Sequence, residues 1–344
     1  MGSTTKFLLA LPAITALKVG VLDPTANKTY VCSAALDAGF TRARIFAPFE
    51  PEALLRQNGQ SQSRINGAKS LLVCALPYGN RHEPALPCTG DCYGTIAPFA
   101  RFNYYREAVK RMKRLSRILR TNYGGIKSDY RIFCNSSIPE KPIAAASGLG
   151  LMGRNSLIIS PEAGSLFIIA AMTLPLALEA DPPLASDPDE FPLCKSCGKN
   201  PPCAAACPTG AVLANGHIDR GKCIQWYASG NSPPKLEEPC LSASNLDLEN
   251  IPAPVRAAWG RRLYGCVSCQ EACIHNKRSI QGVQTEEGAL PAFINIDELL
   301  GLSDLEIKEM FKGTAMGLSW LGPRAIRRNA EMVLAGALNR ENKI

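Results

Sequence analysis

The sequence predicts an α+β fold, in which a mixed helix-and-strand region precedes a cysteine-rich module and a short helical C-terminal segment. Three observations support this prediction. The apolar run Ser70–Leu76 has the length and composition of a buried strand. Arg101–Arg120 carries apolar residues at helical spacing. Nine cysteines lie between Cys194 and Cys273 and mark a separate module. We place the three parts at residues 1–180, 181–290 and 291–344.

The overall composition is that of a globular protein. Of the 344 residues, 46% are hydrophobic and 20% are charged, and the net charge is +8. This mild positive charge allows an anionic partner such as nucleic acid but does not require one. Fourteen cysteines without a convincing secretion signal favour a reducing cytoplasm. The apolar residues 7–14 are expected to form a buried strand or turn, and neither they nor any later stretch is long enough for a membrane helix.

The first region is expected to alternate short helices and strands. Cys32–Gly39 predicts a helix that ends at glycine, and Arg42–Phe46 predicts a strand. The run Ser70–Leu76 ends at Pro77 and suits a central strand, in which Cys74 is a core residue. The same patterns predict a helix at Ile143–Ser147 and further strands at Tyr130–Asn135, Leu157–Ile159 and Ser165–Met172.

The helix predicted at Arg101–Arg120 has two unlike faces. Its apolar stripe consists of Val109, Met112, Leu115, Ile118 and Leu119. Its remaining surface carries Arg106, Lys110, Lys113, Arg114, Arg117 and Arg120. A solvated basic face is slightly favoured over a surface that contacts phosphates.

Glycines recur in the segment that follows the helix predicted at Ile143–Ser147. Gly148, Gly150 and Gly153 precede Arg154-Asn155-Ser156, and repeated glycines allow the backbone to approach a large flat ligand closely. A linker rich in proline and aspartate, Asp181–Pro192, then leads into the cysteine module. After the module, helices are predicted at Asp297–Leu300, Asp304–Phe311 and Pro323–Leu338.

The cysteine module has spacings typical of a protein with two [4Fe–4S] clusters. It reads Cys194-x2-Cys197-x5-Cys203-x3-Cys207-Pro208, followed by Cys223, Cys240 and Cys266-x2-Cys269-x3-Cys273. A Cys-Pro ending is typical of bacterial two-cluster ferredoxins, in which the fourth cysteine of each group binds the other group's cluster. Cluster 1 is therefore assigned Cys194, Cys197, Cys203 and Cys273. Cluster 2 is assigned Cys207, Cys223, Cys266 and Cys269.

Two details of this assignment stay open. Cys223 is chosen as the lone ligand because Cys240 follows a loop rich in proline and glutamate, but Cys240 is not excluded. The x5 gap before Cys203 is longer than the usual x2 and is interpreted as a small loop insertion. Zinc sites favour paired Cys-x2-Cys knuckles, and disulfide scaffolds are usually short and secreted, so both are disfavoured. The loop thiols Cys88 and Cys92 do not define a site by themselves.

Motifs spread over residues 30–340 together resemble the epoxyqueuosine reductase family, whose members are cobalamin-dependent iron–sulfur enzymes that act on tRNA. Besides the eight assigned cysteines, the resemblance is carried by Ala100–Tyr105, Phe133–Ser136, Ala146–Asn155, Tyr264–Gln270, Phe311–Thr314 and Arg327–Ala330. Taken jointly these motifs are specific, because a ferredoxin alone would not carry them.

The resemblance implies an N-terminal nitroreductase-like α/β domain that binds cobalamin, followed by a ferredoxin-like domain with two [4Fe–4S] clusters. It implies that electrons pass through the clusters to cobalamin, which reduces the substrate, while an acid above the corrin delivers a proton. Gly153, Arg154, Asn155 and Ser156 are the expected cobalamin-binding residues. The expected partners are tRNA and an electron donor of the ferredoxin or flavodoxin type.

The sequence departs from the family at the catalytic acid. The family places a proton-donating aspartate at the position matched by Asn135, and an amide has no proton that titrates near neutral pH. An amide still donates hydrogen bonds. The family's Asp-Tyr-His is Asn103-Tyr104-Tyr105 here, which makes Tyr104 and Tyr105 alternative acids. These changes leave three functions open: reduction of epoxyqueuosine, reduction of another electrophile with the same cofactors, or non-catalytic electron transfer or corrinoid handling.

Overall fold

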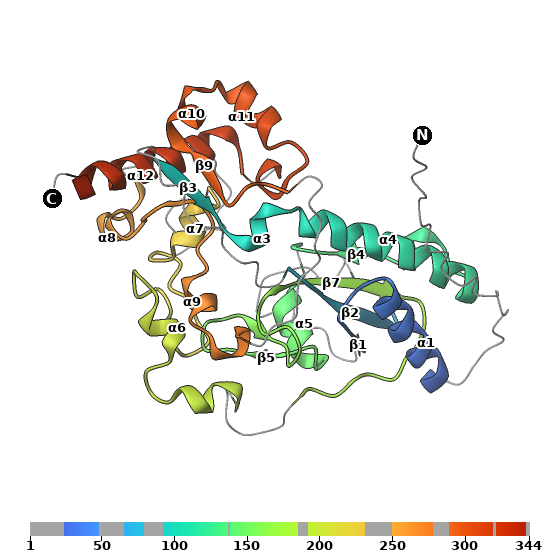
Figure 1. The fold of residues 1–344 in the computed structure, drawn as a ribbon. Helices are drawn as coiled ribbons and strands as arrows, with labels where there is room; N and C mark the ends of the chain where they lie inside the picture. Colours follow the sequence, from blue (N-terminus) through green and yellow to red (C-terminus); the bar gives the residue numbers. More distant parts are fainter. Residues whose placement is uncertain are drawn as a thin grey trace, which may run out of the picture.

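The computed structural model of the chain describes residues 24–47, 65–78, 92–136, 138–184, 192–230, 250–277, 289–318 and 321–341. The predictions for residues 7–14, Cys88 and Cys240 lie outside these ranges. Helices and strands mix along the chain, as the predicted α+β class requires, and the strands form a four-stranded sheet, a three-stranded sheet and a two-stranded hairpin (Figure 1). Within the described ranges, no helix combines the length and apolar character needed to cross a membrane.

An antiparallel sheet organises the first half of the chain. Its strand order is β1-β2-β7-β4, with bounds Arg42–Phe46, Ser70–Pro77, Phe167–Leu174 and Ile132–Phe133. β2 is the central strand, because β1 and β7 pair with its two edges. All eight residues of β2 are buried, which explains why its sequence is almost entirely apolar.

Helices cover both faces of this sheet. Side chains alternate along a strand, so the even-numbered residues of β2 from Leu72 to Leu76 face one helix pair and the odd-numbered residues from Leu71 to Ala75 face the opposite layer. The helix pair is α1 (Pro24–Asp37) and α4 (Tyr104–Tyr123). The opposite layer is α5 (Glu140–Ala146) with the hairpin β5 (Leu151–Met152) and β6 (Ile158–Ile159). Cys74 is a core residue, as predicted.

α4 is fixed at its start by a side-chain cap and along its length by its apolar stripe. Asn103 accepts a hydrogen bond from the Arg106 N–H at 2.9 Å, and its amide donates to the Thr314 carbonyl at 3.2 Å. The buried part of the predicted stripe is Met112, Leu115 and Leu119, with Val109 and Ile118 half-buried at its edges. The exposed cations are Arg106, Lys110, Lys113, Arg114 and Arg117.

The strand predicted at Tyr130–Asn135 is shorter in the structure. β4 keeps only Ile132 and Phe133, and the 3₁₀ turn η2 (Lys127–Asp129) precedes it. The chain bends out of the sheet directly after β4, where Asn135 adopts a left-handed φ of 50°. This bend turns Asn135 away from the sheet.

Short helices and turns hold the cysteines, and prolines at the first turn of α6 and α8 help to start these helices. The elements are η3 (Pro192–Cys197), α6 (Pro202–Ala205), α7 (Ile224–Ala228), α8 (Ala253–Ala257), α9 (Ser268–Glu271) and η5 (Ile274–Asn276).

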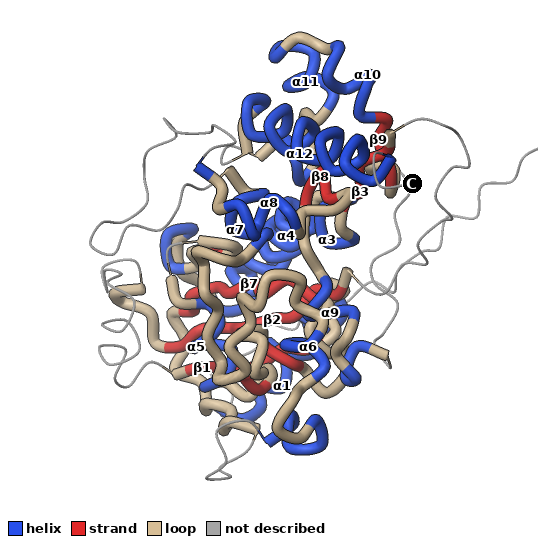
Figure 2. Tube along the Cα trace, turned by 90° about the vertical axis from the view of Figure 1, so that its left-hand side faces the viewer, coloured by secondary structure: helices blue, strands red, loops and turns tan. Residues whose placement is uncertain are grey.

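A three-stranded sheet joins segments that are far apart in the sequence. β3 (Tyr93–Ile96) lies in the middle, parallel to β8 (Arg262–Tyr264) and antiparallel to β9 (Phe293–Asn295). The neighbouring helices are α3 (Pro98–Arg101), α10 (Ile296–Gly301), α11 (Asp304–Met310) and α12 (Pro323–Glu341), with the 3₁₀ turn η6 (Ala315–Gly317). The three C-terminal helices gather at one end of the molecule (Figure 2).

One hydrophobic core surrounds this small sheet. It includes Ile96, Tyr227, Trp259 and Phe311, which come from all three predicted parts of the chain. Strand β3 therefore leaves the first region and packs with the cysteine module and the C-terminal helices. The division at residues 180 and 290 stays a prediction.

Candidate functional site

The four thiols assigned to cluster 1 lie around one small cavity. Cys194 and Cys197 come from η3 and Cys203 comes from α6, while Cys273 follows α9 and joins them from the second cysteine group. Burial raises the pKa of Cys203 and of Cys273, and the charges of the neighbouring thiolates raise each pKa further. The chain thus brings together the residues that the crossed pattern assigns to one cluster.

The cluster 2 cysteines form a second group. Cys223 precedes α7, Cys266 follows β8 and Cys269 lies in α9. Burial raises the pKa of Cys269 to about 12, and the charges of Cys266, Cys223 and Cys207 add to this shift. Burial also acts on Cys207, but backbone N–H groups outweigh it and lower the pKa of that thiol; one of them, from Ala211, donates to the sulfur at 3.2 Å.

The arrangement of the cluster 1 thiols suits an iron–sulfur cube better than a single ion. In a cube each iron binds one thiolate, so the four sulfurs surround a cavity and do not converge on one point. A zinc ion would need its sulfurs about 2.3 Å from a shared centre. In the part of the chain that the structure describes, no three histidine, cysteine, aspartate or glutamate side chains converge on a single metal ion.

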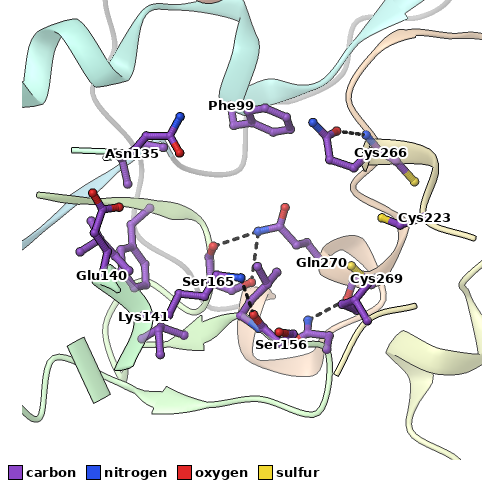
Figure 3. Close-up of a pocket in the computed structure, with 18 of the residues that line it drawn as sticks. Phe99, Asn135, Glu140, Lys141, Ser156, Ser165, Cys223, Cys266, Cys269 and Gln270 are labelled. Atoms are coloured by element: carbon purple, nitrogen blue, oxygen red, sulfur yellow. Dashed lines mark hydrogen bonds between the residues drawn. The ribbon is translucent and has the colours of Figure 1, made fainter. Parts of the chain in front are cut away.

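A cavity of about 630 Å³ lies between the four-stranded sheet and the cysteine module. This volume is within the roughly 300–1,000 Å³ of small-molecule and cofactor sites. Cys223, Cys266 and Cys269 line one wall. Asn135, Glu140 and Lys141 lie on the opposite side, and Ser165 and Gln270 lie between (Figure 3). The cavity therefore adjoins the second cysteine group directly.

The predicted acid positions are divided between cavity and core. Asn135 and Tyr105 line the cavity. Tyr104 is fully buried and packs against Tyr78 and Phe102, so it is not among the cavity-lining residues. Burial raises the pKa of Tyr105 far above its ordinary value, which makes this phenol a weaker acid.

The residues predicted to bind cobalamin are also divided. Asn155 and Ser156 line the large cavity, and the Asn155 amide reaches the Cys269 carbonyl at 3.5 Å. Arg154 instead lines the cluster 1 cavity and donates to the Gly198 carbonyl at 2.5 Å. Gly153 is not among the residues that line either cavity.

The glycines of this loop allow close packing within the protein. A Cβ atom on Gly153 would lie 2.7 Å from Ile159 Cδ1, and one on Gly150 would lie 2.5 Å from Ile158 Cγ2. Gly148 has a left-handed φ of 68° and approaches the Pro182 carbonyl. Packing within the β5–β6 hairpin is sufficient to explain Gly150 and Gly153, and the left-handed turn beside Pro182 explains Gly148.

Several polar residues of the cavity were not predicted from the sequence. Glu140, the first residue of α5, accepts hydrogen bonds from the Ser136 N–H at 2.9 Å and the Ser136 hydroxyl at 3.1 Å. Burial raises the pKa of Glu140, although these donors oppose the shift. Lys141 donates to the Ser156 carbonyl at 2.8 Å, and burial lowers its pKa. The sequence signal that was missed is an acid five residues after Asn135.

Gln270 ties the cysteine module to the sheet. Its amide donates to the Tyr78 hydroxyl at 2.8 Å and to the Ser165 carbonyl at 2.9 Å. Asn276 adds hydrogen bonds to the Ser165 hydroxyl at 3.0 Å and to the Gln270 carbonyl at 2.7 Å. All these contacts are buried, so they fix Cys269, the residue before Gln270, against the cavity wall.

No family model matches the chain, but curated proteins do. An epoxyqueuosine reductase from Bacillus subtilis is 28% identical over 272 residues, which is 78% of this chain and 63% of that protein. One from Escherichia coli is 28% identical over 245 residues, 68% of this chain and 55% of that protein. One from Aliivibrio fischeri is 33% identical over 151 residues, 44% of this chain and 34% of that protein. The chain thus spans less than two thirds of the length of these relatives.

Solved structures of epoxyqueuosine reductases share the fold. The Streptococcus thermophilus structure matches with a TM-score of 0.69 and 21% identity, over 91% of this chain and 82% of that one. A Bacillus subtilis structure with its aspartate-bearing catalytic loop swung out of the active site matches with a TM-score of 0.70 and 23% identity, over the same shares. A further epoxyqueuosine reductase structure, in complex with a tRNA-Tyr stem loop modified with epoxyqueuosine, matches with a TM-score of 0.70 and 24% identity, again over the same shares.

Similarity in sequence to many epoxyqueuosine reductases and similarity in fold to their structures agree with the motifs that run through the chain. The chain is thus similar in sequence to epoxyqueuosine reductases and shares the fold of their solved structures.

Proposed function

We propose that this protein is an iron–sulfur and cobalamin-dependent reductase that converts epoxyqueuosine to queuosine in tRNA. The large cavity supports this proposal most directly, because three thiols of one cysteine group line its wall and the Asn135 loop faces it from the other side. A reductive site needs a supply of electrons beside a space for the electrophile. The curated relatives supply the identity of the substrate.

The two cysteine groups and the cavity would hold the cofactors. Cluster 1 takes Cys194, Cys197, Cys203 and Cys273, and cluster 2 takes Cys207, Cys223, Cys266 and Cys269. Cobalamin would occupy the large cavity, which Asn155 and Ser156 line, while Gly153 and Arg154 belong to the same loop and Arg154 lines the cluster 1 cavity. When bound, cobalamin supplies two-electron reducing chemistry at an electrophilic carbon. On this proposal, residues 1–180 form a nitroreductase-like cobalamin-binding domain, residues 181–290 a ferredoxin-like domain and residues 291–344 a helical segment.

The polar residues around the cavity have separate tasks. Gln270 and Asn276 hold the segment that carries Cys269 against Ser165, just before strand β7 of the sheet. The Asn135 amide can donate a hydrogen bond to a substrate oxygen but cannot release a proton to it. Phe167 and Ile168 of β7 line the cavity on the side of the four-stranded sheet and make that wall apolar.

The partners we propose are tRNA and an electron donor of the ferredoxin or flavodoxin type, in the cytoplasm. The exposed face of α4 carries five cations, and the first turn of the same helix brings Tyr105 to the cavity. A basic face beside the cavity suits the phosphates of an RNA whose modified base enters it.

Asn135 also favours a second candidate, in which the same cofactors reduce a different electrophile. A site without a carboxyl at this position suits a substrate whose leaving group departs without being protonated. A non-catalytic electron carrier or corrinoid-handling protein is the third reading.

Anaerobic purification with added cobalamin tests the proposal, with iron content, cobalt spectrum and activity read on one sample. Activity is measured on tRNA from cells that lack the reductase, with dithionite and methyl viologen as reductant. We expect about eight irons, bound cobalamin and formation of queuosine. Full cofactor content without queuosine would support the other-electrophile candidate. Full iron content without cobalamin would point to an electron carrier.

A further inference from the structure

We propose that Glu140 supplies the proton to the substrate in this cavity, a task that Asn135 cannot perform. The inference rests on the proposed reductase function and adds a catalytic residue to it. Glu140 is the first residue of α5, and in Figure 3 its carboxylate lies on the same side of the cavity as the Asn135 amide. The loop that carries Asn135 and the carboxylate of Glu140 therefore face one space.

Glu140 is the single carboxylate among the described residues that line the cavity. The other titratable groups on the lining suit the task less well. His217 is exposed, and burial raises the pKa of both Tyr78 and Tyr105. Lys141 is held by its hydrogen bond to the Ser156 carbonyl.

The surroundings of Glu140 favour a carboxyl that keeps its proton. Tyr105 from α4 and Cys134 from the end of β4 face it, and burial leaves both of them neutral by raising the pKa of each group. No lysine, arginine or histidine of the described ranges lies within salt-bridge distance of Glu140. Hydrogen bonds from Ser136 orient the carboxylate and favour its charged form in part.

The overall reaction shows where the proton goes. Reduction of the epoxide to an alkene breaks both carbon–oxygen bonds, consumes two electrons and two protons, and releases the oxygen as water. The electrons come from a low-potential donor of the ferredoxin or flavodoxin type. Glu140 gives one proton to the epoxide oxygen as the first carbon–oxygen bond breaks, and its carboxylate then regains a proton from solvent. The second proton also comes from solvent, as the second carbon–oxygen bond breaks and the oxygen leaves as water. A general acid of this kind contributes roughly 10²–10⁴-fold to the rate.

A purely structural role for Glu140 must be separated from this one, because its carboxylate also holds the Ser136 loop. Glu140→Gln keeps an oxygen that can accept from the Ser136 N–H but removes the titrating proton. The double variant Asn135→Asp/Glu140→Gln keeps that oxygen and returns a carboxyl to the loop. Comparison of the two variants separates the effect of losing the proton donor from the effect of disturbing the contact with the Ser136 loop.

The test measures queuosine formation from pH 5 to 9 for the three proteins, each with its iron and cobalamin content determined. We expect Glu140→Gln to lose at least about a hundredfold in turnover with cofactor content unchanged, and the double variant to regain most of it with a different pH profile. Equal activity of Glu140→Gln and the native chain would overturn the inference and leave the proposed function intact. Loss of activity without recovery in the double variant would identify Glu140 as a loop anchor only. An inactive native chain with full cofactors would instead overturn the function.

A second readout does not depend on turnover. Infrared difference spectra of the cofactor-free protein follow the protonated carboxyl band, and the band missing in Glu140→Gln belongs to Glu140. Its titration above the ordinary range for glutamate supports the inference. Titration of that band in the ordinary range would falsify it.

Discussion

On our proposal, Asn135 donates a hydrogen bond to the substrate and Glu140 donates the proton. The family resemblance assigns proton donation to a single aspartate at the position of Asn135. Asn135 occupies a left-handed backbone position at the bend after β4, where asparagine is one of the few side chains tolerated without much strain. Glu140 has an ordinary helical position and a partly desolvated carboxylate. The left-handed position thus holds a hydrogen-bond donor, and on our proposal the helical position holds the acid.

Ser136→Ala tests the protonation of Glu140 through its environment. The Ser136 hydroxyl donates to the carboxylate and so lowers the Glu140 pKa; its removal raises that pKa further. A general acid acts below its pKa and loses activity as the pH rises through it. The alkaline limb of the pH–rate profile should therefore move to higher pH. The control Ser229→Ala, on the thiol side of the cavity, should leave the alkaline limb at the same pH. If Ser136→Ala also leaves it unmoved, Glu140 is not the group whose titration produces this limb.

The sequence predicts the cysteines of the site far better than its other residues. Cys194 and Cys197, or Cys266 and Cys269, are grouped by local spacing that the chemistry of a cluster demands. Glu140 has no such signal, because its role depends on where α5 meets the sheet. Tyr104 and Tyr105 are neighbours in the sequence, but helical geometry turns one into the core and the other to the cavity.

At the level of elements, α9 connects the two proposed clusters. It contains Cys269 of one group, and Cys273 of the other lies just beyond its end. Cys203→Ala and Cys266→Ala should each remove a different cluster, so each variant should retain about half of the iron with a distinct spectrum. Iron analysis and electron paramagnetic resonance of the reduced variants measure this. Depletion of one and the same cluster by both substitutions would contradict the crossed assignment.

Gly265 lets β8 pass close to the start of α3. Its φ is 96°, and an added Cβ would lie 2.3 Å from the Ala97 Cβ. Gly67 has a similar φ of 80° with open space around it. Gly67→Ala should lower the free energy of unfolding by about 1–2 kcal/mol through backbone strain. Gly265→Ala should lower it by more, because it adds a clash beside Cys266. Anaerobic denaturant titration of both variants gives the comparison, and equal losses would exclude the clash.

The longer elements were predictable because each carries its own pattern. β2 is a largely apolar run that ends at a proline, and α12 begins at Pro323 as expected. The strands β3, β8 and β9 were missed. Each has only three or four residues, and each is a strand because of partners far away in the chain. The local sequence therefore does not predict this pairing.

For the molecule as a whole, α12 is locked to the cysteine module by buried polar contacts. The Asn329 amide donates to the carbonyls of Ala228 at 2.9 Å and Leu263 at 3.0 Å, and the buried Arg328 donates to the Tyr227 carbonyl. Asn329→Ala leaves two buried carbonyls without this donor and should lower the free energy of unfolding by roughly 2–4 kcal/mol. Asn215→Ala, at an exposed turn, should change it by less than about 1 kcal/mol. Thermal or denaturant unfolding measures both, and a similar small loss for the two would show that α12 is held by apolar contacts alone.

The small sheet also sets an order of events during biosynthesis. β3 is made early, but its partner β9 leaves the ribosome only after every cysteine assigned to the two clusters. Pairing over such sequence separations is slow, and N-terminal regions generally fold first. The last strand that seals the core around β3 therefore arrives when all eight ligands are already outside the exit tunnel. On our proposal, cluster insertion can thus precede the final closure of this core.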